Sequence, residues 1–295
     1  MHIAVLAAPE SWYVRDLQRA AGDRHRVEPL PFSQLSSRLG GTGPASIYAA
    51  GRELSEFDAV LVRSMPPGSL EQVVFRMDLL GQLEAAGGLV VNSPRGMEAA
   101  IDKYVALARL QQAGLLTPPT IVCQSVDEAL EAFAVLGGDV VVKPIFGGEG
   151  RGLMRVEDPN LALRVIKTLF QLSAVIYLQQ FLPHRGYDIR AFVMGDRIYG
   201  MQRRNPLDWR TNVSRGATAE PVHLTEPMQQ MARRAAAAVD VDMAGVDLLP
   251  TVDGQLYVIE VNAVPGWRAL AQAIDHDMGA DVLGYLEQRW ERRLL

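Results

Sequence analysis

The chain has 295 residues, of which 48% are hydrophobic and 21% are charged. This composition is typical of a folded globular protein and excludes a chain that is mainly disordered or collagen-like. Its 29 Lys and Arg residues against 34 Asp and Glu residues give a net charge of −5. Because a chain-wide basic field is absent, we expect no nucleic-acid partner.

Cysteine content and hydropathy limit the cellular context. The single cysteine, Cys123, excludes an internal disulfide framework and any multi-cysteine metal site. Residues 1–9 lack the cationic and long apolar segments of a secretory signal. No stretch of the sequence approaches the ~18 uninterrupted apolar residues that span a bilayer. We therefore expect a cytoplasmic protein that does not enter a membrane.

Short apolar runs alternate with helical patterns in the first third of the chain. Strands are expected at residues 3–7, 27–30, 59–63 and 89–92, and helices begin near Ser11 and Ser69. This alternation predicts a parallel, doubly wound α/β domain. Residues 36–51, rich in Gly, Ser, Thr and Ala, are expected to form a surface loop or a short helix.

The middle of the chain predicts a separate compact unit. One long helix is expected from Pro94 to about Gly114, because Pro and Gly suit its two ends. Residues 117–119, Thr-Pro-Pro, mark a boundary, after which strands and helices alternate to residue 182. The last third predicts further strands, a helix ending near Val239 and a hairpin over residues 243–261. Three lobes are therefore expected.

A glycine-rich loop follows a buried strand that ends in lysine. Residues 140–144 read Val-Val-Val-Lys-Pro, and residues 147–152 read Gly-Gly-Glu-Gly-Arg-Gly. A Rossmann fingerprint requires a helix after its glycines and a Walker A loop requires lysine after them, so neither motif fits. The pattern fits a flexible flap over a nucleotide, with Lys143 reaching phosphate, or an ordinary glycine hairpin with a solvated lysine.

The predicted hairpin carries two carboxylates. If residues 253–254, Asp-Gly, form a two-residue turn, Asp247 lies directly opposite Glu260, with Asn262 on the same face. Facing carboxylates repel each other, so a compensating cation is expected. Oxygen ligands suit Mg²⁺ or Mn²⁺, completed by water and nucleotide phosphates. The alternatives are that one carboxylate points to solvent through a bulge or that both pair with arginines.

Arginines gather after the strand that begins near Asp188, on which Asp188 and Arg190 share one face. They are Arg203, Arg204, Arg210 and Arg215, with Asn212 between the last two. Beside a metal–triphosphate site these side chains would clamp anions, because guanidinium forks bind phosphate and carboxylate oxygens in pairs. In isolation they would form a solvated basic face. Trp209 is expected to be a lid over substrate or a buried anchor of this loop.

In their order along the chain, these motifs resemble the ATP-grasp superfamily and, more closely, its RimK-like branch of carboxylate–amine ligases. The resemblance covers residues 93–286. It is carried by Asp102-Lys103, Val142-Lys143-Pro144 with the glycine loop, Tyr187-Asp188-Ile189-Arg190, Arg210-Thr211-Asn212, Gly245-Val246-Asp247 and Glu260-Val261-Asn262. It implies a three-lobed ATP-grasp fold of α/β class, with lobes over residues 1–95, 96–182 and 183–295.

The resemblance implies ATP and Mg²⁺ or Mn²⁺ as cofactors, with two ions. Asp247, Glu260 and Asn262 would be the metal ligands. The residues that would bind the nucleotide are Lys103, Lys143, Gly148, Glu149, Gly150, Arg151, Gly152, Gln179, Gln180, Phe181, Leu182, Asp188, Arg210, Thr211 and Asn212. Residues 179–182 would form the adenine-binding linker, where the family usually has Gln-Glu and this chain has Gln-Gln. Arg190, Arg203 or Arg215 would bind the acceptor carboxylate and stabilise the oxyanion.

The implied reaction has two steps: a carboxylate attacks the γ-phosphate of ATP, and an amine then displaces phosphate from the acyl phosphate. In this branch the commonest activity adds L-glutamate to a protein C-terminus or to a pterin- or furan-type cofactor. The alternatives are a ligase for another amino acid or amine and a nucleotide-binding module without ligase activity. An NAD-dependent enzyme ranks last because no glycine fingerprint follows the first strand. Relatives are commonly homodimers or homotetramers.

Overall fold

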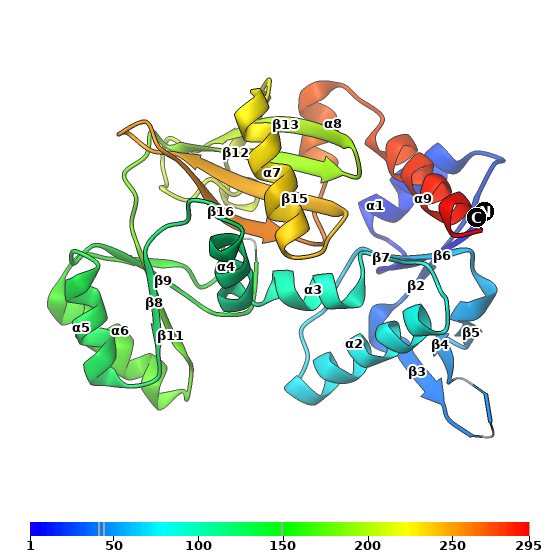
Figure 1. Ribbon diagram of the computed structural model, residues 1–295, viewed down its shortest axis with the longest axis horizontal. Helices are drawn as coiled ribbons and strands as arrows, with labels where there is room; N and C mark the ends of the chain where they lie inside the picture. The colour runs from blue at the N-terminus through cyan, green and yellow to red at the C-terminus, as the bar shows by residue number, and fades with distance from the viewer. Residues whose placement is uncertain (41, 44, 149, 295) are drawn as a thin grey trace.

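The N-terminal lobe is a parallel sheet with helices on both faces. The structure, a computed structural model, describes every residue except 41, 44, 149 and 295. The sheet has the order β2-β1-β6-β7, with β1 (His2–Leu6), β2 (Arg26–Leu30), β6 (Ala59–Val62) and β7 (Val90–Val91) all parallel. Helix α1 (Trp12–Ala21) packs with Ile3 and Val5, whereas α2 (Leu70–Ala85) packs with Ala4 and Leu6 (Figure 1). The predicted doubly wound domain is confirmed.

The loop or short helix expected over residues 36–51 is wrong, because this segment belongs to an antiparallel sheet. Its strands are β3 (Leu35–Arg38), β4 (Ser46–Ala49) and β5 (Arg52–Glu53), flanked along the chain by the 3-10 turns η1 (Phe32–Gln34) and η2 (Leu54–Glu56). Leu35, Ile47 and Ala49 are buried and alternate with more exposed positions. This two-residue period is the signature of a strand, and the abundance of small polar residues hid it.

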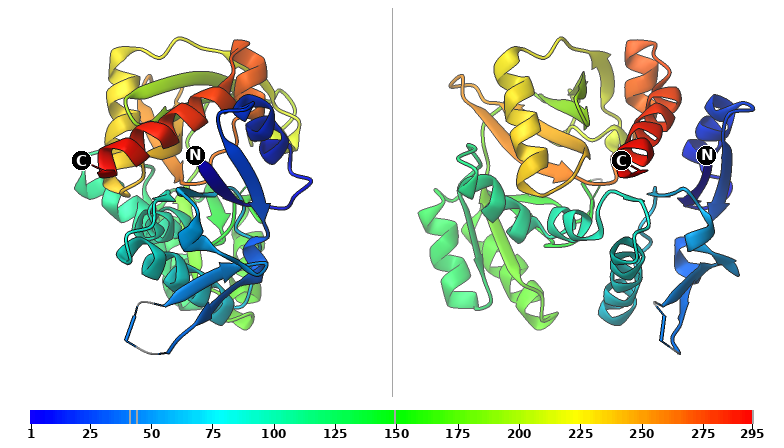
Figure 2. Two further views of the ribbon diagram at one scale, coloured as in Figure 1. Left: turned by 90° about the vertical axis from the view of Figure 1, so that its right-hand side faces the viewer. Right: turned by 45° about the vertical axis from the view of Figure 1, so that its right-hand side comes forward.

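The central lobe has a hydrophobic core of its own. An antiparallel sheet of order β10-β9-β11-β8 contains β8 (Thr120–Cys123), β9 (Val140–Lys143), β10 (Met154–Val156) and β11 (Ile176–Gln180), with helices α5 (Val126–Val135) and α6 (Pro159–Gln171). All side chains of its core come from residues 121–178. The right-hand view of Figure 2 shows its sheet and helices apart from the N-terminal sheet.

Two helices lie between β7 and the central lobe, where a single one was expected. They are α3 (Pro94–Ile101) and α4 (Lys103–Gln112). The break falls at Asp102, whose carboxylate accepts hydrogen bonds from the backbone N–H groups of Tyr104 (2.9 Å) and Val105 (3.0 Å). Aspartate favours this N-cap position because it satisfies free N–H groups at a helix start. The single predicted helix is therefore wrong, and Lys103 begins a new one.

The C-terminal lobe is built on a five-stranded antiparallel sheet of order β14-β13-β12-β15-β16. Its strands are β12 (Tyr187–Met194), β13 (Arg197–Arg204), β14 (Thr218–Pro221), β15 (Met243–Pro250) and β16 (Leu256–Asn262); η3 is Val213–Arg215, and the helices are α7 (Glu226–Ala238), α8 (Arg268–Ile274) and α9 (Met278–Leu294). Helix α7 packs on one face, while Phe192 and Met194 on the other face join a core with α1 and α9. On that second face, the beginning of β12 carries the buried charges Asp188 and Arg190.

Asn92 connects the N-terminal lobe to both strands of the β15–β16 hairpin. The residue follows β7 and is 4% exposed. Its Nδ2 donates to the carbonyl oxygens of Met243 (2.7 Å) and Ala263 (2.5 Å). Its Oδ1 accepts from the backbone N–H groups of Asp242 (3.1 Å) and Met243 (2.9 Å). All four hydrogen-bonding positions of this amide are therefore used.

Replacing Asn92 by alanine is expected to lower the free energy of unfolding by about 2–4 kcal/mol, because buried backbone groups would lose their partners. Denaturant unfolding of the purified protein measures this change. Asn92→Asp is the informative companion, since it keeps the acceptor but points a second oxygen at two carbonyls. We expect it to be at least as destabilising as alanine, and wild-type stability of Asn92→Asp would contradict the role of the donated bonds.

Candidate active site

Asp247 and Glu260 face each other across the β15–β16 hairpin, as the sequence predicts, and Asn262 is paired with Gly245. The expected two-residue turn is wrong, because residues 252–254 form a three-residue turn. A β-bulge in β16 adds one residue between the turn and these pairs. The longer turn and the bulge offset each other, so the predicted register is restored at the two carboxylates.

Two arginines from neighbouring strands hold Asp247. Arg190, its direct partner in the β12–β15 register, donates to both carboxylate oxygens, one of them at 3.0 Å. Arg203 places Nη2 2.8 Å from Asp247 Oδ2. Burial by itself would raise the pKa of the Asp247 carboxyl, but the Arg190 and Arg203 guanidinium groups lower it below its usual value. Asp247 is therefore ionised, and arginines already compensate its charge.

A second acid shares the same arginine. Asp188 faces Arg203 in the β12–β13 register and accepts from its Nε at 2.7 Å, and the Thr211 hydroxyl donates to Asp188 at 2.6 Å. Arg203 thus bridges Asp188 and Asp247, and both of its acid partners are buried. A Cβ at Gly245 would lie 2.4 Å from Arg190 Nη1, so glycine is required where the guanidinium crosses β15. The donors of Arg190 and Arg203 are directed at these acids.

Glu260 differs from Asp247 in its surroundings. It is half-buried, and its carboxylate has no hydrogen bond or ion pair within the part of the chain that the structure describes. Its negative charge opposes the lowering of the pKa values of Lys103 and Lys143 that burial causes. Glu260 is therefore a carboxylate that lies close to two lysines but has no hydrogen-bond or ion-pair partner among the described residues.

Lys143 ends β9 and donates from Nζ to Gln179 Oε1 at 2.5 Å. The Gln179 amide in turn donates to Thr120 Oγ1 at 2.9 Å. Burial lowers the pKa of Lys143 to about 8, against the opposing effect of Glu260. An anion bound near Lys143 would favour its charged form, so this lysine is suited to phosphate.

The residues expected to bind adenine lie at the end of β11. Gln179 and Gln180 belong to the strand, Phe181 and Leu182 follow it, and all four line one cavity. The Arg155 guanidinium lies 3.6 Å from the centroid of the Phe181 ring. The Trp209 ring meets Phe181 edge-on at 5.9 Å, so Trp209 is both a wall of this cavity and an anchor of its own loop.

The glycine flap contacts both Lys103 and the loop after β13. Lys103 Nζ donates to the carbonyl oxygen of Gly147 at 2.6 Å. Arg215 Nη2 donates to the Gly150 carbonyl at 3.3 Å, and a Cβ at Gly150 would lie 2.5 Å from Asn212 Oδ1. Gly150 also has a φ of +70°, so both space and backbone conformation require glycine there.

The remaining predicted nucleotide residues have varied positions. Arg210 pairs with Asp208, and Thr211 and Asn212 line the cavity beside it. Gly148 lines a second cavity, and Gly152 has a φ of +73°. Arg151 interacts with another part of the protein, and Glu149 lies outside the described residues. The Arg210 guanidinium lowers the pKa of Asp208 through a hydrogen bond. Most of the predicted nucleotide residues nevertheless line the cavity that contains the β11 residues.

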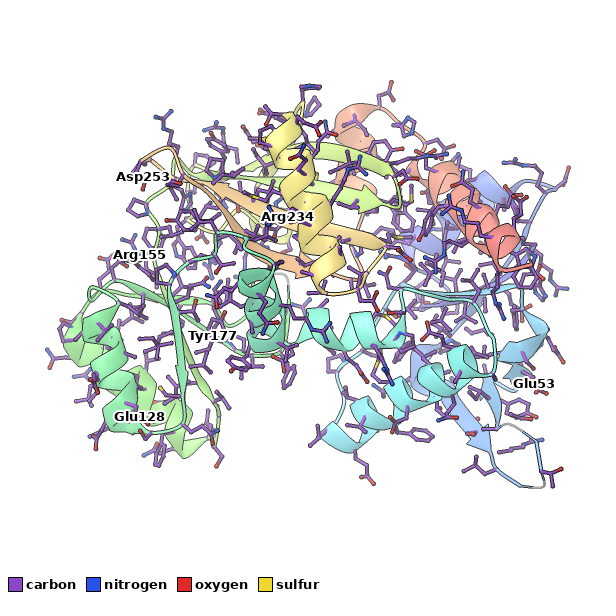
Figure 3. All side chains as sticks on the ribbon, viewed as in Figure 1. Glu53, Glu128, Arg155, Tyr177, Arg234 and Asp253 are labelled. Atoms are coloured by element: carbon purple, nitrogen blue, oxygen red, sulfur yellow. The ribbon has the colours of Figure 1, made fainter. Side chains whose placement is uncertain are left out.

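Two cavities meet at the lysines and Glu260. The smaller, of about 110 Å³, lies between the central and C-terminal lobes and contains the β11 residues and Asp247. The larger, of about 620 Å³, lies between α2, α4, the flap and β16, where Tyr177 of β11 lies beside α4 (Figure 3). Lys103, Lys143 and Glu260 line both cavities. A group at this junction would contact ligands in either cavity.

The metal site predicted from the hairpin fits in part. Glu260 supplies a carboxylate with no hydrogen-bond or ion-pair partner in the described ranges, and Asn262 Oδ1 accepts one hydrogen bond, from the Val264 N–H at 2.9 Å. Asp247 is directly opposite but engaged by arginines. In the described part of the chain, no three His, Cys, Asp or Glu side chains converge in an arrangement that could hold a metal ion. A divalent ion would therefore depend on nucleotide phosphates and water to complete its ligand shell.

Two polar residues that are buried at the carboxyl ends of parallel strands were not among the predicted site residues. Arg63 directly follows β6, and Asn92 directly follows β7. Ligands of open α/β sheets bind at this edge, so a polar residue just after an apolar run was the available signal.

Comparison with known protein families identifies the class to which this fold and its paired cavities belong. Residues 1–97 match the RimK PreATP-grasp domain, and residues 100–286 match the RimK-like ATP-grasp domain. The chain therefore belongs to the RimK-like ATP-grasp family, whose enzymes form C–N bonds. No helix within the described residues is long and apolar enough to cross a bilayer.

Relatives and solved structures agree with this assignment. The tetrahydromethanopterin:alpha-L-glutamate ligase of Methanosarcina acetivorans is 32% identical, over 95% of this chain and 96% of the relative. A probable alpha-L-glutamate ligase of Picosynechococcus is 31% identical, over 98% and 96%. A RimK domain ATP-grasp protein from Sphaerobacter thermophilus has a TM-score of 0.75 at 23% identity, over 97% and 99%. The macrocyclase MdnC of Microcystis aeruginosa, bound to a precursor peptide, has a TM-score of 0.74 at 16% identity, over 98% and 100%. These structures confirm the predicted ATP-grasp fold.

Proposed function

We propose that the protein joins the amino group of L-glutamate to an acceptor carboxylate and converts ATP to ADP and phosphate. The glutamate ligase names of its relatives support this choice of amine. The acceptor carboxylate attacks the γ-phosphate, ADP leaves, and the amine then attacks the acyl carbon and releases phosphate. The observation that carries this proposal is the junction of two cavities at Lys103, Lys143 and Glu260, since both substrates must reach the phosphoryl group.

In this proposal the nucleotide lies in the smaller cavity. Its adenine would lie against the β11 residues, and its phosphates would point to Lys103 and Lys143. Glu260 and Asn262, with Asp247 opposite, would hold two Mg²⁺ ions, which neutralise charge on the transferring phosphoryl group. Arg215 already contacts the flap, so it is suited to join flap closure to anion binding.

The smaller cavity must widen before ATP can enter. Its volume of about 110 Å³ is below the ~300–1,000 Å³ that is usual for ligand sites. The central lobe has a separate core, so it can rotate away without disrupting the other lobes. Lid and lobe closure over substrate is a common way to exclude water from a reactive intermediate. An acyl phosphate requires such exclusion.

The larger cavity suits an acceptor whose carboxylate is attached to an apolar body. Three of its polar residues, Lys103, Lys143 and Glu260, lie at the junction with the nucleotide cavity, and Arg76 and Asn262 line it elsewhere. Its other walls are mainly apolar, with side chains from the N-terminal lobe, α4 and the flap; they include Phe32, Met65, Leu70, Val73, Met77, Ala106, Leu107, Leu110 and Phe146. An acidic protein tail would leave these walls without apolar contacts, so a ring-bearing small molecule is the better fit.

An assay of ADP release tests the function. Purified protein is given ATP, Mg²⁺ and L-glutamate with either N-(4-aminobenzoyl)-L-glutamate, an aromatic carboxylate, or the peptide Ala-Ala-Ala-Glu, and the products are identified by mass spectrometry. We expect ADP release that requires both acceptor and glutamate, with the aromatic acceptor preferred. Nucleotide binding without turnover on any carboxylate would favour a binding module instead, and preference for the peptide would assign a protein-tail acceptor.

Placing a charge on the apolar wall is expected to weaken acceptor binding. Val73→Glu should raise the KM for the acceptor about 10–100-fold, because a carboxylate would be buried against an apolar ligand, while ATP affinity stays unchanged. Val74→Glu is the matched control, since its neighbour Val74 is 48% exposed and faces away from this cavity. Steady-state kinetics distinguishes them, and equal KM values for both variants would contradict the acceptor assignment.

A further inference from the structure

Arg63 lies at the edge of the N-terminal sheet where α/β proteins bind ligands. It directly follows β6, and its backbone N–H donates to the Leu6 carbonyl at the end of β1 at 3.1 Å. Two residues later, Met65 lines the larger cavity. The carboxyl ends of parallel strands form the ligand-binding edge of such sheets. Arg63 itself lines neither cavity; its side chain lies against Tyr13 and Trp267, and Trp267 ends the segment whose first residue, Ala263, lines the larger cavity.

Aromatic rings cover both faces of the Arg63 guanidinium. Its Cζ lies 4.6 Å from the centroid of the Tyr13 ring and 4.4 Å from that of Trp267. Trp267 is fully buried, and its Nε1 donates to Asp16 at 2.9 Å, which fixes the ring. A Cβ at Gly266 would lie 2.3 Å from the Tyr13 hydroxyl, so glycine is required beside this stack. With both faces covered, the guanidinium can bind a ligand only through its in-plane N–H groups.

The Arg63 charge has no counter-ion in the part of the chain that the structure describes. The residue is only 7% exposed, and its Nε is sealed from solvent without a hydrogen-bond partner. Neither Nη nitrogen has a hydrogen-bond partner among the described residues, and neither is fully sealed from solvent. Burial lowers the pKa of Arg63 to about 10, which still leaves it charged at neutral pH. By contrast, the buried Arg190 and Arg203 are both paired with acids.

The two ring contacts recover part of the cost of burying this charge, but they leave its in-plane N–H groups without acceptors among the residues that the structure describes. An anion that approaches in the plane of the guanidinium would supply the missing partner through paired hydrogen bonds. Both substrates of the proposed reaction carry carboxylates. Segments on both sides of the stack lead to the larger cavity, since Ala263, four residues before Trp267, lines it as Met65 does.

We infer that Arg63 binds a carboxylate group of a substrate, so that the N-terminal lobe takes part in substrate recognition. This carboxylate comes from L-glutamate or from the acceptor, and it is not the group that reacts. The inference rests on the proposed function for its choice of ligand. It assigns Arg63 to binding and leaves phosphoryl transfer to the residues at the cavity junction.

The test uses Arg63→Met, which keeps the length of the side chain and removes the charge. We expect the KM for one substrate to rise about 10–100-fold, with kcat within about threefold and thermal stability equal to or above wild type. A raised KM for glutamate assigns its carboxylate to Arg63, and a raised KM for the acceptor assigns the acceptor's. Arg268→Met is the matched control, because Arg268 also stacks on a ring, that of Trp12, but is exposed. It should change neither KM.

Arg63→Lys keeps the inference falsifiable if Arg63→Met does not fold. It retains the charge without the fork, so a KM raised several-fold is expected, and unchanged KM values for both substrates in either variant would overturn the inference. If the wild-type protein releases no ADP with any acceptor, the proposed function fails. A binding measurement then tests the inference about Arg63 separately. Calorimetric titration with L-glutamate and with N-(4-aminobenzoyl)-L-glutamate then supports the inference if Arg63→Met loses binding. Equal binding to both proteins, or none to wild type, overturns it.

Discussion

Replacing Glu260 by glutamine is expected to lower kcat about 10²–10³-fold and to abolish Mg²⁺-dependent strengthening of ATP binding. Glu260 is the carboxylate at the cavity junction that has no partner among the described residues, so it is available to a divalent ion. Loss of electrostatic stabilisation at a transferring group typically has this effect. ADP release and calorimetric titration of ATP with and without Mg²⁺ measure the two effects.

The same substitution should leave the fold intact, so it tests the metal site more directly than a substitution at Asp247 does. Glutamine at position 260 removes a carboxylate that has no hydrogen-bond or ion-pair partner among the described residues, and Asp247 keeps both of its arginines. Asp247→Asn would instead leave two buried arginines poorly compensated, and breaking such a pair is strongly destabilising. Glu131→Gln, on the exposed side of α5, is the matched control and should change nothing. Unaltered Mg²⁺ dependence in Glu260→Gln would refute the metal assignment.

The hairpin illustrates which structural features the sequence predicts well. The facing of Asp247 and Glu260 follows from two apolar strands and a short turn, and it is confirmed. The turn itself is one residue longer than predicted, and a β-bulge removes the resulting shift. Local patterns therefore determined which residues meet, whereas turn length and bulge are adjusted together by packing of the strands on the rest of the lobe.

The partners of the predicted residues could not be predicted in the same way. Asp247 was expected to bind a metal ion, with pairing to arginines as an alternative, and its partners in the structure are Arg190 and Arg203 from two other strands. Their pairing depends on strand order within the sheet, which a single sequence does not reveal. The role of Asp102 was also not predicted: it caps α4 and so divides a helix that the apolar pattern predicts as continuous.

The division of the cores indicates which parts of the molecule move. The N-terminal and C-terminal lobes share two hydrophobic clusters, and Asn92 joins β7 to the hairpin by four hydrogen bonds. The central lobe shares neither cluster. The carboxylates and Arg63 are therefore held in one rigid frame, while Lys143 and the flap belong to the part that can open. Closure would bring Lys143 to a phosphate that the frame already positions.

That arrangement makes Lys143 the source of a distinctive pH dependence. Its pKa of about 8 lies below the usual 10.5 because of burial. Phosphate binds the charged form, so ATP affinity should be constant below pH 8 and fall up to about tenfold per pH unit above it. Stability of the ligand-free fold should change in the opposite direction. The penalty for burying the ammonium is present in full below pH 8 and is relieved as pH rises from about 8 to 10.5.

Lys143→Met should remove both effects and weaken ATP binding about 10–100-fold at pH 7, because it deletes the charge without adding a polar group. Calorimetric titration of ATP at pH 7, 8 and 9, in buffers of different ionisation enthalpy, also measures how many protons the protein takes up on binding. Wild type should take up a proton on binding at pH 8–9, whereas the variant should not. Lys167→Met, at an exposed position of α6, should behave as wild type. Proton uptake that persists in Lys143→Met would assign the titration to another group and would separate the flap lysine from phosphate binding.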